Sequence, residues 1–382
     1  MRLLKKIFLL SKIYFVGALG ALLFVLANLI LKVRLTRLDV INFGRFVDNY
    51  NVLKNNRIFE DDKRIIFWLN SNIISNQYTL ELYKKNYKIY NYNFFFFATD
   101  RILNMFNNNV ILKVPEVFSF EKKIFLKKDK KNINEFGWSF DNHIKFSDDD
   151  EKKGENFLAQ FNLNKRSKWI CIHNRDELYK KKIKEYNADK THVHRNFDIN
   201  DMSYAIDVFI NNGFHVFRVG SIQSSKMQYV KKNFYDIDNY RDNDGFIQIF
   251  LSKYCRAYFG SNSGSSSPYH AFKKPISYIN FAPLHLNLFN FFKTLPSIPK
   301  KVVCKKTGKY LSLKDLYEQN LIGCSDYKVL LEQDIAHENN SPEDIKDLAL
   351  EIIDCLENKD HYDKDDIDLQ KRYLDIFNKY NK

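Results

Sequence analysis

The sequence predicts an α/β protein in which two Rossmann-like domains follow an N-terminal hydrophobic membrane helix. Three observations lead to this prediction. Residues 13–31 contain no charged side chain. From residue 168 to residue 281, short apolar strands alternate with helical segments, which is the pattern of a parallel sheet with right-handed crossovers. A weaker alternation of the same kind extends from about residue 38 to residue 146.

Length and composition agree with this division. The chain has 382 residues, of which 45% are hydrophobic and 28% are charged, as in foldable globular proteins. Domains usually contain about 100–200 residues, so two are expected. We assign a membrane anchor to residues 1–36, an N-terminal Rossmann-like domain to 37–160, a C-terminal Rossmann-like domain to 161–330 and a helical tail to 331–382.

The net charge of +14 is unevenly distributed. Residues 331–382 carry 15 acidic and 7 basic side chains, so the remaining 330 residues carry +22. An excess of this sign favours anionic partners, such as phosphate-bearing substrates or a membrane surface. The basic residues are dispersed and form no nucleic-acid readout motif, which argues against a nucleic-acid partner.

The uncharged segment Ile13–Leu31 predicts membrane attachment. As a helix its 19 residues extend about 28 Å, close to the ~30 Å thickness of the hydrocarbon core. The segment exceeds the apolar core of a signal peptide, and basic residues follow it where a small-residue cleavage site would lie. Four basic residues precede it and three follow it, so the positive-inside rule gives no orientation. A transmembrane and a monotopic arrangement both remain open.

After the anchor, the predicted elements follow from periodicity and from breaker residues. The run of four phenylalanines at 94–97 is compatible with a strand or a helix. Ser147 is a predicted helix cap, and so is Ser341, which Pro342 follows. We expect strands over 64–69, 169–172, 215–220, 257–260 and 276–281, and helices over 77–85, 147–160, 199–211, 246–254 and from 269 and 342 onward.

A loop rich in Gly and Ser, Ser261–Pro268, follows one of these strands and precedes a helix. Backbone N–H groups converge in such a loop, and the start of the helix carries partial positive charge. This geometry binds a phosphate or a diphosphate at the carboxyl edge of a parallel sheet. The alternative is an ordinary polar loop, because neither a GxGxxG nor a P-loop pattern is present.

Two other strand ends carry polar side chains toward the same edge. The first strand of the C-terminal domain ends in His173-Asn174-Arg175-Asp176. Arg175 is suited to bind a diphosphate bidentately, and His173 or Asp176 is a candidate general base. Arg218 and Gly220 end the next strand. The alternative is a structural Arg–Asp pair.

Other polar clusters are less suited to chemistry. His192 and His194 lack a third ligand at zinc spacing, so we expect Arg195 and Asn196 to form a substrate loop instead. Asp148–Asp150 is expected to start a helix and not to bind a metal. The five cysteines form no CxxC motif and are odd in number, which favours a reducing compartment for the main body.

Several short motifs occur in the same order as in a family of bacterial glycosyltransferases associated with surface-polysaccharide biosynthesis, which the chain resembles over most of its length after the anchor. At Asn42–Arg45 and at Gln248 the sequence departs from the family pattern, which has an Arg-Ile-Gly-His run and an acidic residue there. The matching motifs are Arg37–Asp39, Ser75–Gln77, Tyr87–Tyr90, His173–Asp176, Arg195-Asn196, Arg218–Gly220, Ser263-Gly264, Gly308–Leu316, Asn340–Ile345 and Leu369–Tyr373.

The resemblance implies a GT-B-like fold and transfer of a sugar from a nucleotide-diphosphate donor to a surface glycan or lipid-linked acceptor. It places the acceptor on the N-terminal domain and the nucleotide sugar on the C-terminal domain. The chain is more distantly similar to GT-B fucosyltransferases with a His-x-Arg motif, whose Arg contacts the donor diphosphate; this implies the same role for Arg175. The expected catalytic residues are His173, Arg175 and Asp176, and the expected diphosphate-binding residues are Arg218, Gly220, Ser261, Ser263, Gly264 and Ser265.

On this interpretation the enzyme needs neither a metal nor a cofactor besides the nucleotide-sugar substrate. It is expected at the bacterial inner membrane, attached through residues 13–31, with its catalytic domains on the cytoplasmic side. Two other functions remain open. One is a membrane-anchored nucleotide or phosphate sensor without catalysis. The other is a transferase that moves a different group, such as pyruvyl, onto a polysaccharide.

Overall fold

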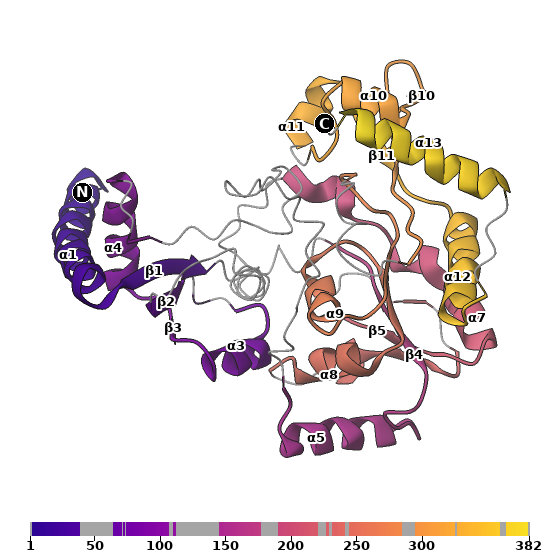
Figure 1. Cartoon of the computed structure of the whole chain (residues 1–382), viewed down its shortest axis with the longest axis horizontal. Helices are drawn as coiled ribbons and strands as arrows, with labels where there is room; N and C mark the ends of the chain where they lie inside the picture. Colours follow the sequence, from indigo (N-terminus) through magenta and orange to yellow (C-terminus); the bar gives the residue numbers. More distant parts are fainter. Residues whose placement is uncertain are drawn as a thin grey trace. The chain divides into compact units, whose positions relative to one another are not determined.

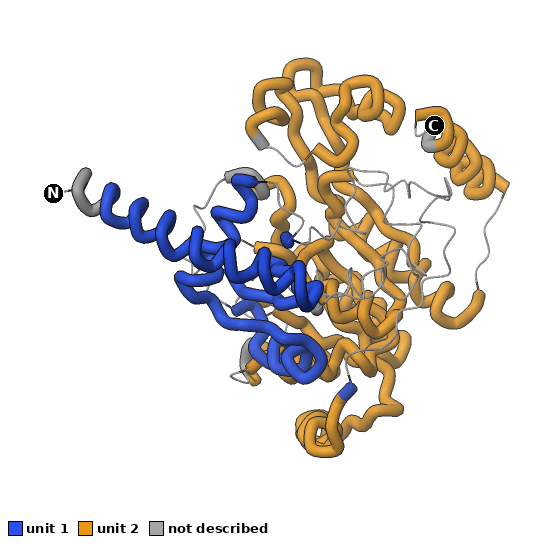
Figure 2. The backbone as a smooth tube through the Cα atoms, turned by 60° about the vertical axis from the view of Figure 1, so that its left-hand side comes forward, with its two compact units in different colours: residues 1–119, 123–145 blue, residues 120–122, 146–382 orange. Residues whose placement is uncertain are grey.

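Figure 1 presents a computed structural model of the chain, in which two compact units are distinguished (Figure 2). Unit 1 comprises residues 1–119 and 123–145, and unit 2 comprises 120–122 and 146–382. The structure describes residues 2–38, 64–70, 72, 74–106, 110–111, 145–176, 190–220, 227–228, 231–240, 244–284, 295–324, 327–359 and 364–380.

Unit 1 is built on a small parallel sheet. Its strands have the order β1-β2-β3, and Ile111 forms a further parallel bridge to Leu35 on the open side of β1. Unit 1 is therefore a parallel α/β unit, as the alternation of strand and helix in the sequence predicts. The elements are α1 (Arg2–Leu31), β1 (Val33–Leu38), β2 (Arg64–Leu69), α3 (Gln77–Lys84), β3 (Ile89–Tyr90) and α4 (Phe94–Met105).

The sequence did not predict strand β1 of unit 1, and it left the structure of residues 94–97 open. Strand β1 was not expected, and its first residues lie within the 1–36 range assigned to the anchor, because the helix already ends at Leu31. The four phenylalanines at 94–97 open a helix, which Asn93 caps by accepting a hydrogen bond from the backbone N–H of Phe96. The ring of Phe96 packs against Trp68 of β2, with ring centroids 6.4 Å apart.

Unit 2 contains a five-stranded, fully parallel sheet with the order β6-β5-β4-β7-β8. The strands expected around 169, 215, 257 and 276 are all present, and the short edge strand β6 is an addition. The elements are α5 (Asp148–Ala159), β4 (Trp169–His173), α7 (Ser203–Asn211), β5 (His215–Arg218), β6 (Phe234–Asp236), α8 (Phe246–Tyr254), β7 (Ala257–Gly260), α9 (Ser267–Ala271) and β8 (Ile276–Tyr278).

Helix α5 belongs to unit 2. Gly154 lies so close to the ring of Phe250 in α8 that an added Cβ would be 2.1 Å from it. Tyr254, the last residue of α8, donates its hydroxyl to the carboxylate of Glu151 in α5, 2.6 Å away. The units therefore divide at residue 145, before this helix, whereas the sequence-based boundary at 160 follows it.

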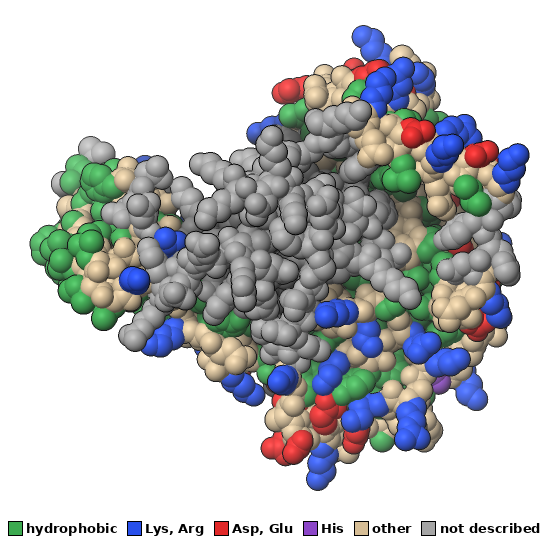
Figure 3. Space-filling model, in the orientation of Figure 1, with side chains coloured by type: hydrophobic (Ala, Val, Ile, Leu, Met, Phe, Trp, Pro, Cys, Tyr) green, Lys and Arg blue, Asp and Glu red, His purple; other side chains and the backbone are tan. Residues whose placement is uncertain are grey.

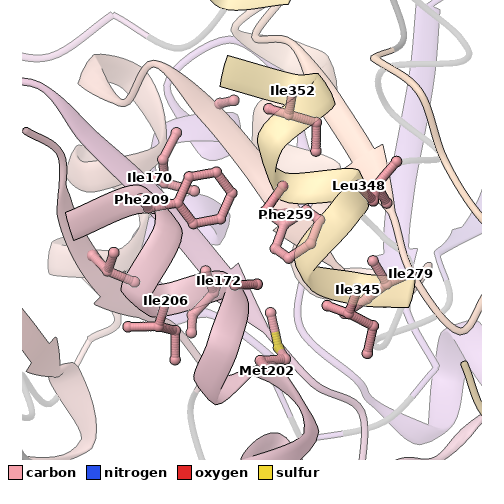
Figure 4. Close-up of a cluster of buried hydrophobic side chains, with 14 of the residues drawn as sticks. Ile170, Ile172, Met202, Ile206, Phe209, Phe259, Ile279, Ile345, Leu348 and Ile352 are labelled. Carbon is pink, nitrogen blue, oxygen red and sulfur yellow. The ribbon is translucent and has the colours of Figure 1, made fainter. Parts of the chain in front are cut away.

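The tail is an integral part of unit 2. Helix α12 (Pro342–Leu356) starts at the Ser341 cap with Pro342 in its first turn, as predicted. Its residues Ile345, Leu348 and Ile352 point into one core with side chains of β4, β7 and α7 (Figure 4). Leu350 lies on the other side of the helix and is 46% exposed.

A second, antiparallel sheet of order β10-β9-β11 was not expected from the sequence. It brings together residues on either side of the predicted 330/331 boundary, so that boundary does not separate two structural parts. The elements here are β9 (Lys301–Cys304), β10 (Lys309–Tyr310), α10 (Leu313–Glu318), α11 (Tyr327–Glu332), β11 (Ile335–Glu338) and α13 (Lys364–Tyr380).

Candidate functional site

The strand order of unit 2 creates a topological switch point. From β4 the chain proceeds to β5 and β6 on one side of the sheet, and β7 and β8 lie on the other side. In open parallel sheets, ligands bind outside the carboxyl ends of the strands at the point where the order reverses. Here that point lies between β4, which ends at His173, and β7, which ends at Gly260.

Gly260 allows the two strands at the switch point to approach closely. It pairs with His173 in the β4–β7 ladder. An added Cβ at Gly260 would be 2.2 Å from the backbone oxygen of His173, which no side chain can tolerate. The next residue, Ser261, donates its backbone N–H to the same oxygen over 2.9 Å and is fully buried. The Gly/Ser loop thus begins at a fixed position beside His173.

His173 is held in one orientation and one tautomer. Its ring Nδ1 lies 2.8 Å from the backbone oxygen of Val219. Since a carbonyl oxygen accepts only, Nδ1 must carry the proton, and Nε2 is left with a free lone pair. Burial lowers the pKa of His173 to about 4, and the nearby cations of Arg218 and Arg175 act in the same direction. The imidazole is therefore neutral near pH 7 and able to accept a proton at Nε2.

Arg175 lies two residues beyond His173. Its Nη1 is buried and has no hydrogen-bond partner among the residues that the structure describes. Burial lowers the pKa of Arg175 to about 10, so the guanidinium is still charged near pH 7. A buried cationic N–H group that lacks an acceptor is costly unless an anion is bound to it. Arg175 is the strongest anion-binding candidate at the switch point.

Arg218 has a different environment from the one that the sequence suggested. Its side chain is 1% exposed and forms an ion pair of 2.9 Å with Asp236 at the end of β6. A second guanidinium nitrogen lies 3.3 Å from the side-chain oxygen of Asn174, and Asn174 in turn donates to the backbone oxygen of Phe197. These contacts connect the ends of three neighbouring strands. Gly220 follows two residues later with a φ of 142°.

The Gly/Ser loop forms a short 3₁₀ turn, Gly264–Ser266, before α9. Ser263 precedes this turn, and its backbone oxygen accepts the hydroxyl of Ser266 over 2.8 Å. Gly264 is exposed and Ser265 is partly buried. The loop residues expected to bind a diphosphate, Ser261, Ser263, Gly264 and Ser265, therefore all directly follow β7 at the switch point.

The proposed substrate loop is connected to the Gly/Ser loop. Arg195 ends a 3₁₀ helix, η2 (Lys190–Arg195), and its guanidinium donates to the backbone oxygen of Asn262. The backbone oxygen of the following residue, Asn196, accepts the ammonium of Lys300 over 2.7 Å. The structure thus brings Arg195 beside the loop that follows β7, with Asn196 next to it in the chain.

Sequence reasoning missed Lys300 and Asp236, and it named Asn174 without assigning it a role. Lys300 is 4% exposed, and burial lowers its pKa to about 8. It follows Pro299 and precedes another lysine, so it looks like one of the many surface lysines of the chain. Asp236 ends a strand of three residues, which is too short to produce a recognisable alternation. A polar residue directly after an apolar strand is the signal that identifies Asn174.

The remaining polar motifs have structural explanations. Ser147 and Asp150 form a reciprocal capping box at the start of α5, which accounts for the Asp148–Asp150 run. Asp176 is partly buried beside Arg175, and its carboxylate favours the protonated form of His173. Among the described residues, no group of three or more His, Cys, Asp and Glu side chains is placed to hold a metal ion.

No family model matches the sequence, and no curated protein matches it either. Among solved structures, the chain is similar to the glycosyl transferase family 9 protein from Veillonella parvula DSM 2008, with 11% identity and a TM-score of 0.47 over 84% of this chain and 97% of that one. It is also similar to E. coli ADP-heptose lps heptosyltransferase II, with 12% identity and a TM-score of 0.39 over 84% of this chain and 99% of that one. At scores this low, neither similarity assigns a fold or an activity to the chain.

Proposed function

We propose that the chain is a glycosyltransferase that moves a sugar from a nucleotide-diphosphate donor to a surface glycan or a lipid-linked acceptor. The observation that carries the proposal is Arg175, a half-buried guanidinium whose buried Nη1 is unpartnered among the described residues, at the switch point of a parallel sheet. A diphosphate bound there would give this Nη1 its hydrogen-bond acceptors and would compensate the free-energy cost of its burial. Unit 2 would thus bind the donor, and unit 1, with its own parallel sheet, would bind the acceptor.

In the proposed reaction, the bond between the anomeric carbon and the diphosphate oxygen breaks while the acceptor oxygen bonds to that carbon. Arg175 and the N–H groups of the Ser261–Ser265 loop stabilise the charge that develops on the departing nucleoside diphosphate. The Nε2 of His173 takes the proton of the acceptor hydroxyl, and Asp176 is the alternative base. The neutral state of His173 near pH 7 suits this role. No step in this scheme needs a metal or a further cofactor.

The environment of Arg218 changes its part in the proposal. Since its guanidinium is buried and paired with Asp236, we assign it to holding Asn174 and the end of β4 in place. Arg195, whose guanidinium holds the backbone oxygen of Asn262, is assigned to fixing the Gly/Ser loop. Both residues would then support binding of the donor through the backbone that they position.

We also propose that α1 attaches the enzyme to the bacterial inner membrane, with the catalytic units on the cytoplasmic side. Its segment Lys6–Leu31 is long and apolar enough to cross a membrane, as no other helix among the described residues is. Only 22% of its most apolar window is buried within the protein, which is unlike the core helix of a soluble domain. Attachment would bring the active site to a lipid-linked acceptor.

The test compares Arg175→Ala with the wild type and with Arg256→Ala, in full-length protein. Arg256 is an exposed arginine at the amino end of β7, away from the carboxyl edge. A panel of nucleotide sugars is titrated calorimetrically, and release of nucleoside diphosphate is then assayed. A hydrogen bond to a charged group contributes about 1.5–3 kcal/mol, so Arg175→Ala should bind the donor roughly 10- to 100-fold more weakly. Arg256→Ala should bind the donor as the wild type does.

Each result has a distinct meaning. Wild-type binding and turnover in Arg175→Ala would contradict the assigned role of that residue. Binding without any released nucleoside diphosphate would favour a nucleotide sensor over an enzyme. If the wild type bound no nucleotide sugar, both the glycosyltransferase and the nucleotide sensor would be excluded. Transfer of another group, such as pyruvyl, would then be favoured.

A further inference from the structure

Helix α1 packs against the rest of unit 1 along its middle. Its buried residues Ile13, Gly17, Gly20 and Phe24 are spaced as one face of a helix. This face contacts α4, which lies beside α1 in Figure 1. The approach is close, because a Cβ added to Gly17 would be 2.5 Å from the backbone oxygen of Ala98, and one added to Gly20 would be 1.9 Å from the Thr99 hydroxyl. The two glycines let the backbones meet as in tightly packed helix pairs.

Helix α4 also packs against the sheet of unit 1. Its residues Phe96 and Leu103 share one buried cluster with Leu35 of β1 and Trp68 of β2. Phe24 of α1 belongs to the same cluster. One side of the middle of α1 is therefore covered by a folded α/β unit.

The end of α1 is fastened to the same unit. A single residue, Lys32, separates the helix from β1. The side-chain amide of Asn28 donates to the backbone oxygen of Val33, the first residue of β1, over 2.7 Å. The helix therefore has no linker that would let it turn away from the sheet.

The opposite face of α1 is exposed and apolar, and apolar side chains cover this part of the surface in Figure 3. These side chains repeat at helical spacing over six turns of the helix. They are Phe8, Phe15, Leu19, Leu22, Leu26 and Leu29, each between 46% and 76% exposed.

We infer that α1 lies in the plane of one anionic leaflet of a lipid bilayer, with this apolar face in the acyl chains and α4 on the water side, and does not cross the membrane. A crossing helix has its middle enclosed by hydrocarbon. Because α4 packs against the middle of α1, it would have to enter the bilayer together with α1. Its 12 residues extend only about 18 Å, which is shorter than the ~30 Å hydrocarbon core. The exposed Arg101 and the strands beneath α4 would follow, and charged groups and open sheet edges are excluded at that depth.

The basic residues of α1 suit the phosphate layer of an anionic leaflet. Lys6 and Lys12 are both exposed. The ammonium of Lys12 lies over the ring of Phe94 in α4, 5.0 Å from its centroid, so this charge is directed toward the α4 side and away from the apolar face. Basic side chains beside an embedded apolar face add electrostatic attraction to anionic lipids.

This inference rests on the membrane attachment proposed above and not on the sugar transfer. The test places single tryptophans on the apolar face of the full-length protein, in the variants Phe8→Trp, Phe15→Trp, Leu22→Trp and Leu29→Trp. Each is reconstituted with vesicles of phosphatidylethanolamine and phosphatidylglycerol that carry bromine at defined acyl positions. The depth of each tryptophan follows from quenching after subtraction of the parent protein's fluorescence. Tyr204→Trp, at an exposed position of α7 in unit 2, is the control that no bromolipid should quench.

An in-plane helix predicts the same shallow depth for all four tryptophans, near the boundary of headgroups and acyl chains. A crossing helix predicts Phe15→Trp and Leu22→Trp near the bilayer centre and the other two near opposite interfaces, since positions 8 and 29 are about 32 Å apart along the axis. That profile would overturn the inference. Absence of quenching at all four positions would overturn it too, and would point to a second protein copy as the occupant of the face. None of these readouts depends on nucleotide-sugar binding, so the outcome is separable from the proposed activity.

Discussion

The ring Nδ1 of His173 donates to the backbone oxygen of Val219, 2.8 Å away, and so joins the ends of two neighbouring parallel strands, β4 and β5. This contact fixes the tautomer of the imidazole, and burial lowers its pKa to about 4. The proposed base is therefore oriented before any substrate arrives. Its protonation also affects the stability of the fold.

Protonation of His173 predicts a loss of stability in mild acid. The unfolded imidazole takes up its proton near pH 6.5, whereas the folded one does so near pH 4. Between these values the unfolded state binds more protons, so the free energy of unfolding falls as pH decreases from about 6.5 to 4, by at most about 3 kcal/mol. Urea unfolding at a series of pH values should show a weaker dependence in His173→Gln than in the wild type.

His337 of β11 provides a comparison, because burial lowers its pKa to about 4 as well. His337→Gln should weaken the acid dependence in the same pH window. If His173→Gln and the wild type lost stability in parallel, the imidazole at 173 would not be the buried neutral group described here.

Gly260→Ala is predicted to disrupt the switch point. The new methyl group would be 2.2 Å from the backbone oxygen of His173, so β4 and β7 would have to separate. We expect a loss of about 3 kcal/mol or more in the free energy of unfolding, measured by chemical denaturation. Gly308→Ala is the control, because no atom lies within 4 Å of an added Cβ there and only its φ of 69° is unfavourable, at a cost of about 1 kcal/mol. Equal losses in the two variants would contradict the close approach.

Asp236→Asn is predicted to destabilise unit 2 strongly. It removes the charge that pairs with Arg218, whose side chain is 1% exposed. Removing one partner of a buried ion pair costs about 3–5 kcal/mol, because the other charge stays buried without compensation. Asp347→Asn is the matched control, since its pair with Lys346 is exposed on both sides and should contribute less than about 1 kcal/mol. A shift in thermal midpoint as small as that of the control would argue against a structural role for Arg218.

Much of unit 2 follows from the sequence, because its signals are local. Helix α8 occupies residues 246–254 and β7 occupies 257–260, as the apolar runs and the following glycine predict. The start of α12 follows from Ser341 and Pro342. Polar residues after apolar strands also identify the correct edge of the sheet for His173, Arg175 and Ser261.

The features that were missed depend on pairing between distant parts of the chain. Strand β1 contains two arginines and a threonine, and its apolar and polar residues alternate only over Val33–Thr36; its pairing with β2 makes it a strand. Burial of Arg218 depends on Asp236, 18 residues later, and burial of Lys300 depends on Asn196, 104 residues earlier. A single sequence contains no local signal for such partners. For this reason Arg218 was expected to bind the donor diphosphate, and Lys300 was not noticed.

Lys300→Met is predicted to change both the alkaline stability and the binding of the donor. In the folded protein burial lowers the pKa of Lys300 to about 8, although the Asp201 carboxylate opposes this, whereas the unfolded side chain titrates near 10.4. Between these values the unfolded state binds more protons, so the wild type should gain stability as pH rises from about 8 to 10.4, by up to about 3 kcal/mol. The methionine variant lacks this gain.

Because the ammonium of Lys300 holds the backbone oxygen of Asn196, its loss should also loosen the segment that carries Arg195. We therefore expect weaker binding of the nucleotide-sugar donor by Lys300→Met in calorimetric titration, with the secondary structure unchanged. Lys301→Met serves as the control, because the neighbouring lysine is exposed and pairs with Asp344 at the surface. If both variants bound the donor as the wild type does while only Lys300→Met lost the alkaline gain, Lys300 would stabilise the fold without positioning the loop.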